Sequence, residues 1–202
     1  MVTAIKQGRF MQKQDIETYC PVSWEDWRNW LKENHDSKQS VWVIYYKKKS
    51  NIPSITYTDA VDQALCFGWI DSTRKSLDND MFMQFFCRRK PNSVWSKINK
   101  GKVQQLIEAG LMTKAGFDSI ETAKQNNSWT ILDDVEELNI PADLAKEFES
   151  KAESNQYFLS LSRSVRKAIL QWLVLAKRPE TRKKRIIEIV VLAAQKQKPK
   201  QF

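Results

Sequence analysis

Residues 69–88 read WIDSTRKSLDNDMFMQFFCR, and this stretch decides the fold. The tetrad LDND at 77–80 has the composition of a turn, and the segments on either side of it, 69–75 and 81–88, have the composition of β-strands. The stretch therefore predicts a β-hairpin. Upstream, the β-branched and aromatic run at 41–46 shows no helical periodicity and predicts a further strand.

Two helical patterns accompany these strands. Ser23 followed by Asp26 predicts an N-cap for a helix that runs to about Asn34. Thr58 predicts the cap of a second helix that ends near Phe67, with Gly68 as its C-cap. The inward-facing residues of the two helices are predicted to be Trp24, Trp27, Trp30 and Leu31 in the first and Val61, Ala64 and Leu65 in the second.

Beyond Pro91 the pattern is helical throughout. Ser96 and Thr113 predict the caps of two helices that form a helical hairpin. The inward-facing residues of this hairpin are predicted to be Val103, Leu106, Ile107, Phe117, Ile120 and Ala123. Residues 133–153 carry a net charge of −6 and predict a short, mostly solvated helix. A long helix over about 155–176, a last helix starting at Pro179 and a frayed tail from Lys196 complete the expected pattern.

The predicted fold class is therefore α+β: a small antiparallel sheet packed by helices, followed by a C-terminal helical hairpin. The expected divisions are an α+β body over 1–130, an acidic connecting segment over 131–153, and the hairpin with its polar tail over 154–202. No Gly/Ser-rich linker and no repeat divides the chain more sharply.

Composition limits the class of protein and its partners. The 202 residues include 33 Lys and Arg against 24 Asp and Glu, a net charge of +9, which favours anionic partners. The N-terminus, 1–10, lacks the apolar core of a signal peptide, and no segment has the roughly 20 apolar residues that a bilayer requires. Three widely spaced cysteines favour reduced thiols. We therefore expect a cytoplasmic protein without a membrane span.

Three blocks of sequence carry a resemblance to a known family. They are ALCFGWID at 64–71, RRKPNSVWSKIN at 88–99, and AKRPETR at 176–182 followed by Arg185 and Ile186. Together they resemble the bacterial YdeI/OmpD-associated family, also described as bacteriocin-protection proteins. The resemblance implies an association with resistance to antimicrobial peptides and with outer-membrane porins. It implies no catalytic residues.

The second block is the main candidate for a binding site. Residues 74–102 carry a net charge of +6, and the basic strand end lies beside a helix N-terminus, which is a favourable receptor for an anionic small molecule or phosphate. Trp95 could stack on such a ligand. The alternative interpretation is that Ser96 only caps the helix and that Trp95 is a core residue. The candidate ligand-binding residues are Trp69, Asp71, Arg74, Arg88, Arg89, Lys90, Trp95, Ser96, Lys97 and Asn99.

Two other functions stay open. Residues 163–185 carry a net charge of +8, which suits a nucleic-acid backbone but could equally be neutralised by the acidic segment upstream. The candidate nucleic-acid contacts are Arg163, Arg166, Arg178, Arg182 and Arg185. Asp71 is a candidate for a general base in an enzyme, which requires its carboxylate and the Arg88 guanidinium to converge on one pocket. The simpler expectation is an ion pair of Asp71 with Arg74 or Arg88.

Metal, cofactor and triad chemistry find no support in the sequence. The cysteines lack C-x-x-C spacing, and His35 is the sole histidine. Neither a G-x-x-x-x-G-K-[ST] nor a G-x-G-x-x-G motif occurs. We expect no metal and no cofactor.

Overall fold

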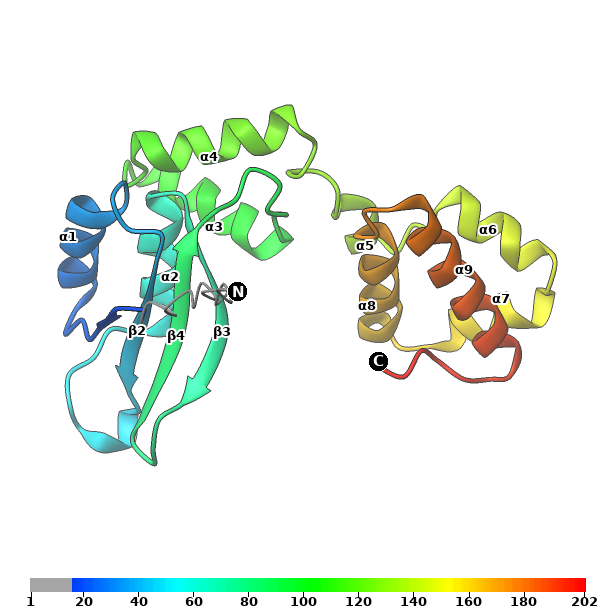
Figure 1. Cartoon of the computed structure of the whole chain (residues 1–202), viewed down its shortest axis with the longest axis horizontal. Helices are drawn as coiled ribbons and strands as arrows, with labels where there is room; N and C mark the ends of the chain where they lie inside the picture. The colour runs from blue at the N-terminus through cyan, green and yellow to red at the C-terminus, as the bar shows by residue number, and fades with distance from the viewer. Residues whose placement is uncertain (1–15) are drawn as a thin grey trace, which may run out of the picture. The chain divides into compact units, whose positions relative to one another are not determined.

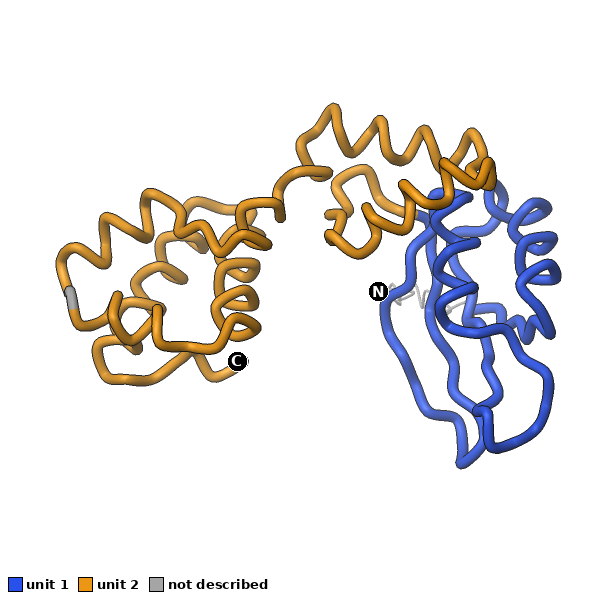
Figure 2. The backbone as a smooth tube through the Cα atoms, turned by 180° about the vertical axis from the view of Figure 1, so that it is seen from behind, with its two compact units in different colours: residues 1–88 blue, residues 89–202 orange. Residues whose placement is uncertain are grey.

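The structure is a computed structural model that describes residues 16–202. The predicted absence of a signal peptide concerns residues outside this range. Residue contacts divide the chain into two compact units, Met1–Arg88 and Arg89–Phe202 (Figure 2). Both boundaries predicted from the sequence, after residues 130 and 153, fall inside the second unit.

The first unit contains a four-stranded sheet in the order β1-β2-β4-β3. Its strands are β1 (Thr18–Tyr19), β2 (Ser40–Tyr46), β3 (Trp69–Ser76) and β4 (Met81–Arg88). The predicted hairpin is confirmed as the antiparallel pair β3–β4, and β2 pairs antiparallel with β4. The sheet is mixed rather than purely antiparallel, because β1 pairs parallel with β2. The intervening helix makes this parallel crossover connection.

Two helices, α1 (Trp24–Asn34) and α2 (Tyr57–Cys66), cover one face of the sheet (Figure 1). Side chains that alternate along the strands, among them Val41, Val43 and Phe86, are fully buried. A short 3-10 helix, η1 (Lys48–Ser50), follows β2. The predicted α+β class with helices after the sheet is confirmed.

The ends of these helices test the predicted caps. The Ser23 hydroxyl accepts a hydrogen bond from the Asp26 amide at 3.2 Å, as predicted. The cap predicted at Thr58 is wrong, because Thr56 lies two residues earlier and accepts from the Asp59 amide at 3.1 Å. Gly68 has a φ of +71°, as a C-cap glycine requires.

One tryptophan of α1 does not face the core. Trp27 and Trp30 stack with ring centroids 5.1 Å apart and are buried, as predicted. Trp24 is 41% exposed and is the first residue of α1, whose buried residues begin one turn later at Trp27. The prediction that Trp24 faces inward is therefore wrong.

The hairpin contains one irregularity. The register between β3 and β4 shifts between Asp71 and Arg74, which is the mark of a β-bulge. The Gln84 side-chain amide bridges the bulge, donating to the Asp71 carboxylate and the Ser72 carbonyl, each at 2.9 Å. Within the bulge and beyond it, residues 72–76 of β3 are exposed.

The second unit is helical. Its helices are α3 (Lys97–Glu108), α4 (Lys114–Gln125), α5 (Asp133–Glu136), α6 (Ala142–Glu149), α7 (Ala152–Ser160), α8 (Arg163–Val174) and α9 (Pro179–Ala194). The caps predicted at Ser96 and Thr113 and the start at Pro179 are confirmed. Ile107 and Phe117, predicted inward, are 37% and 43% exposed, because each lies at the margin of a narrow buried stripe.

The prediction of one long helix over 155–176 is wrong, because two helices, α7 and α8, occupy this region. The helical conformation is interrupted after α7, and the Ser162 hydroxyl caps α8 by accepting a hydrogen bond from the Val165 amide at 3.4 Å. A serine N-cap offers the backbone an alternative to continuing a helix, although the apolar periodicity runs on.

The core of the second unit includes residues from both the acidic segment and the tail. Leu144 and Phe148 of α6 are buried, whereas the other residues of this helix are exposed apart from the half-buried Ala145, so the helix is mostly solvated, as predicted. The acidic segment does not form one short helix, because it contains α5, α6 and the start of α7. Phe202 packs against Trp172 with ring centroids 5.9 Å apart, so the tail is not simply frayed. In the part of the chain that the structure describes, no helix has both the length and the hydropathy to cross a bilayer. The buried cluster consists of Leu132, Val135, Leu144, Phe148, Phe158, Ile169, Leu170, Leu173, Ile186, Ile189 and Val190.

Candidate functional site

The ten candidate ligand-binding residues are divided between the two units. The first unit holds Trp69, Asp71, Arg74 and Arg88, and the second holds Arg89, Lys90, Trp95, Ser96, Lys97 and Asn99. Trp69 is fully buried, and its indole N–H donates to the His35 carbonyl at 3.3 Å. Trp69 is therefore part of the core rather than a ligand platform.

Asp71 has hydrogen-bonding partners other than those expected. Its carboxylate accepts from the Tyr57 hydroxyl at 2.7 Å and from the Gln84 amide at 2.9 Å. Burial of the phenol, together with this hydrogen bond to Asp71, raises the pKa of Tyr57 to about 12. The carboxylate is thus held by two neutral groups.

The arginines predicted to pair with Asp71 lie elsewhere. The Arg74 guanidinium stacks 3.8 Å from the centroid of the Phe82 ring. Arg88 donates through Nε to the His35 carbonyl at 2.6 Å, and its Nη2 lies 3.8 Å from the Asp36 carboxylate. The ion pair predicted for Asp71 is therefore absent from the described residues. The general-base hypothesis required Asp71 and Arg88 to converge, whereas the two side chains contact different groups.

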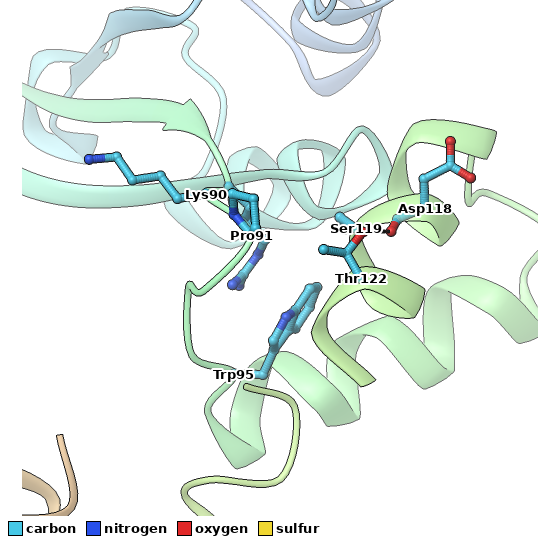
Figure 3. Close-up of a pocket in the computed structure, with 7 residues that line it drawn as sticks. Lys90, Pro91, Trp95, Asp118, Ser119 and Thr122 are labelled. Atoms are coloured by element: carbon cyan, nitrogen blue, oxygen red, sulfur yellow. Dashed lines mark hydrogen bonds between the residues drawn. The ribbon is translucent and has the colours of Figure 1, made fainter. Parts of the chain in front are cut away.

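Three of the candidates do meet at one hollow in the second unit. Arg89, Lys90 and Trp95 line a cavity of about 170 Å³ (Figure 3). The Arg89 guanidinium lies 3.6 Å from the centroid of the Trp95 ring and donates to the Val94 carbonyl at 3.3 Å. Figure 3 shows the Lys90 side chain pointing away from Trp95. The hollow therefore presents the guanidinium of Arg89 as its cationic group.

Trp95 supports this arginine rather than exposing a stacking surface. Its side chain is 1% exposed, and its ring lies 5.0 Å from that of Trp129. The Trp95 amide also donates to the Ser128 carbonyl at 3.4 Å. The alternative interpretation of Trp95 as a core residue is therefore supported.

The opposite wall of the hollow comes from α4 and was missed in the sequence. It consists of Asp118, Ser119 and Thr122, which lie within about one turn of the helix. The hydroxyls of Ser119 and Thr122 each donate to a carbonyl of their own helix at 2.8 Å. Nothing in the local sequence of α4 signals that it faces Arg89, because the contact depends on tertiary packing.

The remaining candidates of the second block make structural contacts. The Ser96 hydroxyl accepts from the Asn99 amide at 3.2 Å and so caps α3. The Lys97 ammonium lies 3.5 Å from the Glu137 carboxylate. Neither Ser96, Lys97 nor Asn99 lines the hollow beside Trp95.

The basic C-terminal region, the other candidate interface, is largely engaged within its own unit. Arg182 forms a bidentate pair with Asp143, at 2.5 and 2.9 Å, and also donates to the Leu173 carbonyl at 3.5 Å. Arg185 donates to the Trp172 carbonyl and lies 4.7 Å from the centroid of the Trp172 ring. Both arginines thus satisfy carbonyls in the last turn of α8.

The acidic segment 133–153 supplies hydrogen-bond and ion-pair partners for further basic residues. Lys167 lies 2.7 Å from the Glu136 carboxylate, and Arg163 donates to the Glu136 carbonyl at 2.6 Å. Lys100 of α3 pairs with Asp133. Arg166 is half-buried, and Arg178 is exposed immediately before α9. This pattern favours internal neutralisation over a continuous surface for nucleic acid.

The part of the chain that the structure describes was expected to hold no metal, and its potential ligands are dispersed. Over residues 16–202, no group of three or more His, Cys, Asp or Glu side chains is placed to hold a metal ion. The cysteines Cys20, Cys66 and Cys87 are reduced and form no disulfide with one another. Burial raises the pKa of the Cys66 thiol, which disfavours the reactive thiolate.

Comparison with known families supports the resemblance found in the sequence. Residues 137–196 match the family described as Bacteriocin-protection, YdeI or OmpD-Associated, so the predicted family is confirmed for this part of the chain. Residues 20–119 match a family described only as a domain of unknown function. The blocks at 64–71 and 88–99 fall within this second match. No curated protein and no solved structure matches the chain significantly.

Proposed function

We propose that this protein, which carries a domain of the bacteriocin-protection family, binds a small anion at Arg89. The observation that carries the proposal is the position of the Arg89 guanidinium, stacked on the buried Trp95 at the edge of a hollow. A planar guanidinium matches the geometry of a carboxylate or phosphate. Its fixed orientation lowers the entropy lost on binding.

The size and lining of the hollow narrow the class of ligand. A volume of about 170 Å³ admits one anionic group, whereas sites for whole drug-sized molecules have roughly 300–1,000 Å³. The hydroxyls of Ser119 and Thr122 can donate to such a group in exchange for their hydrogen bonds to the carbonyls of α4. The proposed ligand is thus inorganic phosphate, a small carboxylate, or the anionic end of a larger molecule. The cytoplasmic location expected from the sequence stays a prediction.

A titration with inorganic phosphate, followed by chemical shifts of backbone amides in the full chain, tests the proposal. We expect shifts centred on Arg89, Trp95 and Ser119 that saturate with phosphate, and similar shifts with acetate if any small anion binds. Arg89→Gln should abolish them, and Arg89→Lys should retain part of the affinity because it keeps the charge.

Arg185→Gln is the matched control. Arg185 also lies over a tryptophan and donates to a carbonyl, yet it caps α8. The control should bind phosphate with the affinity of the wild type. Unchanged binding in a folded Arg89→Gln variant, or an equal loss in both variants, would refute the proposal.

A further inference from the structure

A larger cavity in the second unit brings together two of the sequence blocks. It has a volume of about 650 Å³, and its walls come from segments 92–94, 126–134 and 174–177. Asn92 and Val94 belong to the block at 88–99, and Ala176 and Lys177 belong to the block at 176–186. Residues far apart in the chain therefore share one concave surface, of a size typical for small-molecule sites.

The walls of this cavity are fixed by hydrogen bonds of their own. The Asn126 side chain donates to the Pro91 carbonyl at 2.8 Å and accepts from the Ser128 amide at 3.0 Å, which ties two walls together. Arg182 and Arg185 hold the third wall through the carbonyls of the last turn of α8. A wall that is ordered before the ligand arrives loses less entropy on binding.

Other polar groups of the lining are not used by the fold. Among the described residues, the side chains of Asn92, Asn127 and Lys177 make no hydrogen bond or ion pair, and all three are exposed. Asp134 accepts from the Asn139 amide through Oδ1 at 2.8 Å, which leaves Oδ2 for another donor. The lining thus offers two free amides, one ammonium and one carboxylate oxygen.

The rest of the lining is aliphatic. Val94, Ile131, Val174 and Leu175 contribute apolar surface, and none of the described lining residues is aromatic. Nucleobases and sugar faces are commonly bound by aromatic stacking, which this cavity does not offer. The single Asp and single Lys of the lining cancel in charge, which disfavours a polyanion. A ligand that carries both charges, amides and aliphatic groups complements this surface.

We propose that this cavity binds a short peptide with free termini. Lys177 receives the terminal carboxylate, Asp134 receives the terminal ammonium, and the amides of Asn92 and Asn127 bond the peptide backbone. The aliphatic lining accommodates apolar side chains. An adjoining cavity of about 420 Å³ shares Ile131, Asp134 and Val174 and provides space for a bulky first residue. This site is separate from the hollow at Arg89, so it stands independently of the function proposed above.

Titration calorimetry of the full chain with the tripeptide Leu-Ala-Leu tests the inference, in parallel with its C-terminal amide and its N-acetyl form. We expect the free peptide to bind at least about tenfold more tightly than either blocked form, because each block removes one charge-assisted contact. Lys177→Gln should remove the discrimination between the free and amidated peptides while leaving the effect of acetylation.

Lys184→Gln is the control, since Lys184 is likewise exposed and lies outside the cavity. This variant should discriminate as the wild type does. Equal affinity of the wild type for free and amidated peptides, loss of discrimination in the Lys184 variant, or no measurable heat with any form at 10 mM peptide would overturn the inference. Failure of phosphate to bind at Arg89 would leave these outcomes unchanged.

Discussion

Two arginine–tryptophan pairs in the second unit look alike and serve different ends. Arg89 lies over Trp95 and Arg185 lies over Trp172, and each guanidinium also donates to a backbone carbonyl. The carbonyl bound by Arg185 belongs to the last turn of α8, so that pair closes a helix end. Arg89 instead borders a hollow with hydroxyls on its far wall.

The difference shows that the local pair does not define a binding site. The position of the accepting carbonyl and the presence of an opposing wall decide what the guanidinium does. Arg182 reinforces the point, because its anionic partner is the protein's own Asp143. A cluster of basic residues in a sequence therefore indicates a ligand site only after the acidic residues that pair with it inside the protein have been identified.

The largest expected effect separates the two tryptophans. Trp95→Ala should destabilise the protein by about 3–5 kcal/mol, because the side chain is almost wholly buried between Arg89 and Trp129. Trp172→Ala should cost roughly half as much, since Trp172 is only half-buried. Urea denaturation of both variants measures the difference. Equal losses would mean that the two pairs are energetically equivalent.

Removing Arg182, the arginine that pairs with Asp143, should have the next largest effect on stability. Arg182→Ala removes the bidentate contact with Asp143 and the contact with the Leu173 carbonyl, and it should cost about 1–3 kcal/mol of unfolding free energy. The exposed neighbour Lys183 serves as the control, and Lys183→Ala should change stability by less than about 0.5 kcal/mol. A similar loss in both variants would contradict the assignment of Arg182 as a structural residue.

The same contact predicts a dependence on pH. Hydrogen bonding to Arg182 lowers the pKa of Asp143 below its ordinary value of 3.8. The folded state therefore favours the ionised form of Asp143 more than the unfolded state does. The contact stabilises the fold fully above the pKa that Asp143 has in the unfolded chain, and this stabilisation is lost as the pH falls through its lower pKa in the folded protein. The melting-temperature difference between wild type and Asp143→Asn should be constant near neutral pH and shrink in acid. A difference that grew in acid would contradict this sign.

The smallest expected effect is at Arg178. Within residues 16–202 this exposed side chain makes no hydrogen bond or ion pair, unlike the side chains of Arg182 and Arg185. Arg178→Ala should therefore change the unfolding free energy by less than about 0.5 kcal/mol. Thermal denaturation of Arg178→Ala and Arg185→Ala in parallel measures the difference in stability. Equal losses of stability in the two variants would contradict the prediction that Arg178 makes no stabilising contact.

Local signals in the sequence were the most reliable. Ser23, Ser96 and Thr113 cap helices as predicted, because a cap depends on a few consecutive residues. Where two candidates compete, as with Thr56 and Thr58, spacing alone did not choose the right one. The break at Ser162 was hidden because apolar periodicity continues across it.

Long-range features could not be predicted in the same way. Arg89 and Trp95 are close in sequence and do meet, whereas Ser119 and Thr122 reach the hollow only through the packing of α4. The exposure of Phe117 likewise depends on how wide a stripe its neighbours cover. The opposite charges of 133–153 and 163–185 indicated that the two segments pair. Which acidic residue binds which basic residue depends on the tertiary structure.

The bulged strand β3 bears on how the protein behaves at high concentration. It forms an edge of the sheet, and a regular edge would offer its free amides and carbonyls to a strand of another molecule. The bulge between Asp71 and Arg74 disrupts that hydrogen-bonding row, and Arg74 and Lys75 add charge to the exposed stretch after it. The hairpin that organises the first unit thereby also discourages edge-to-edge aggregation.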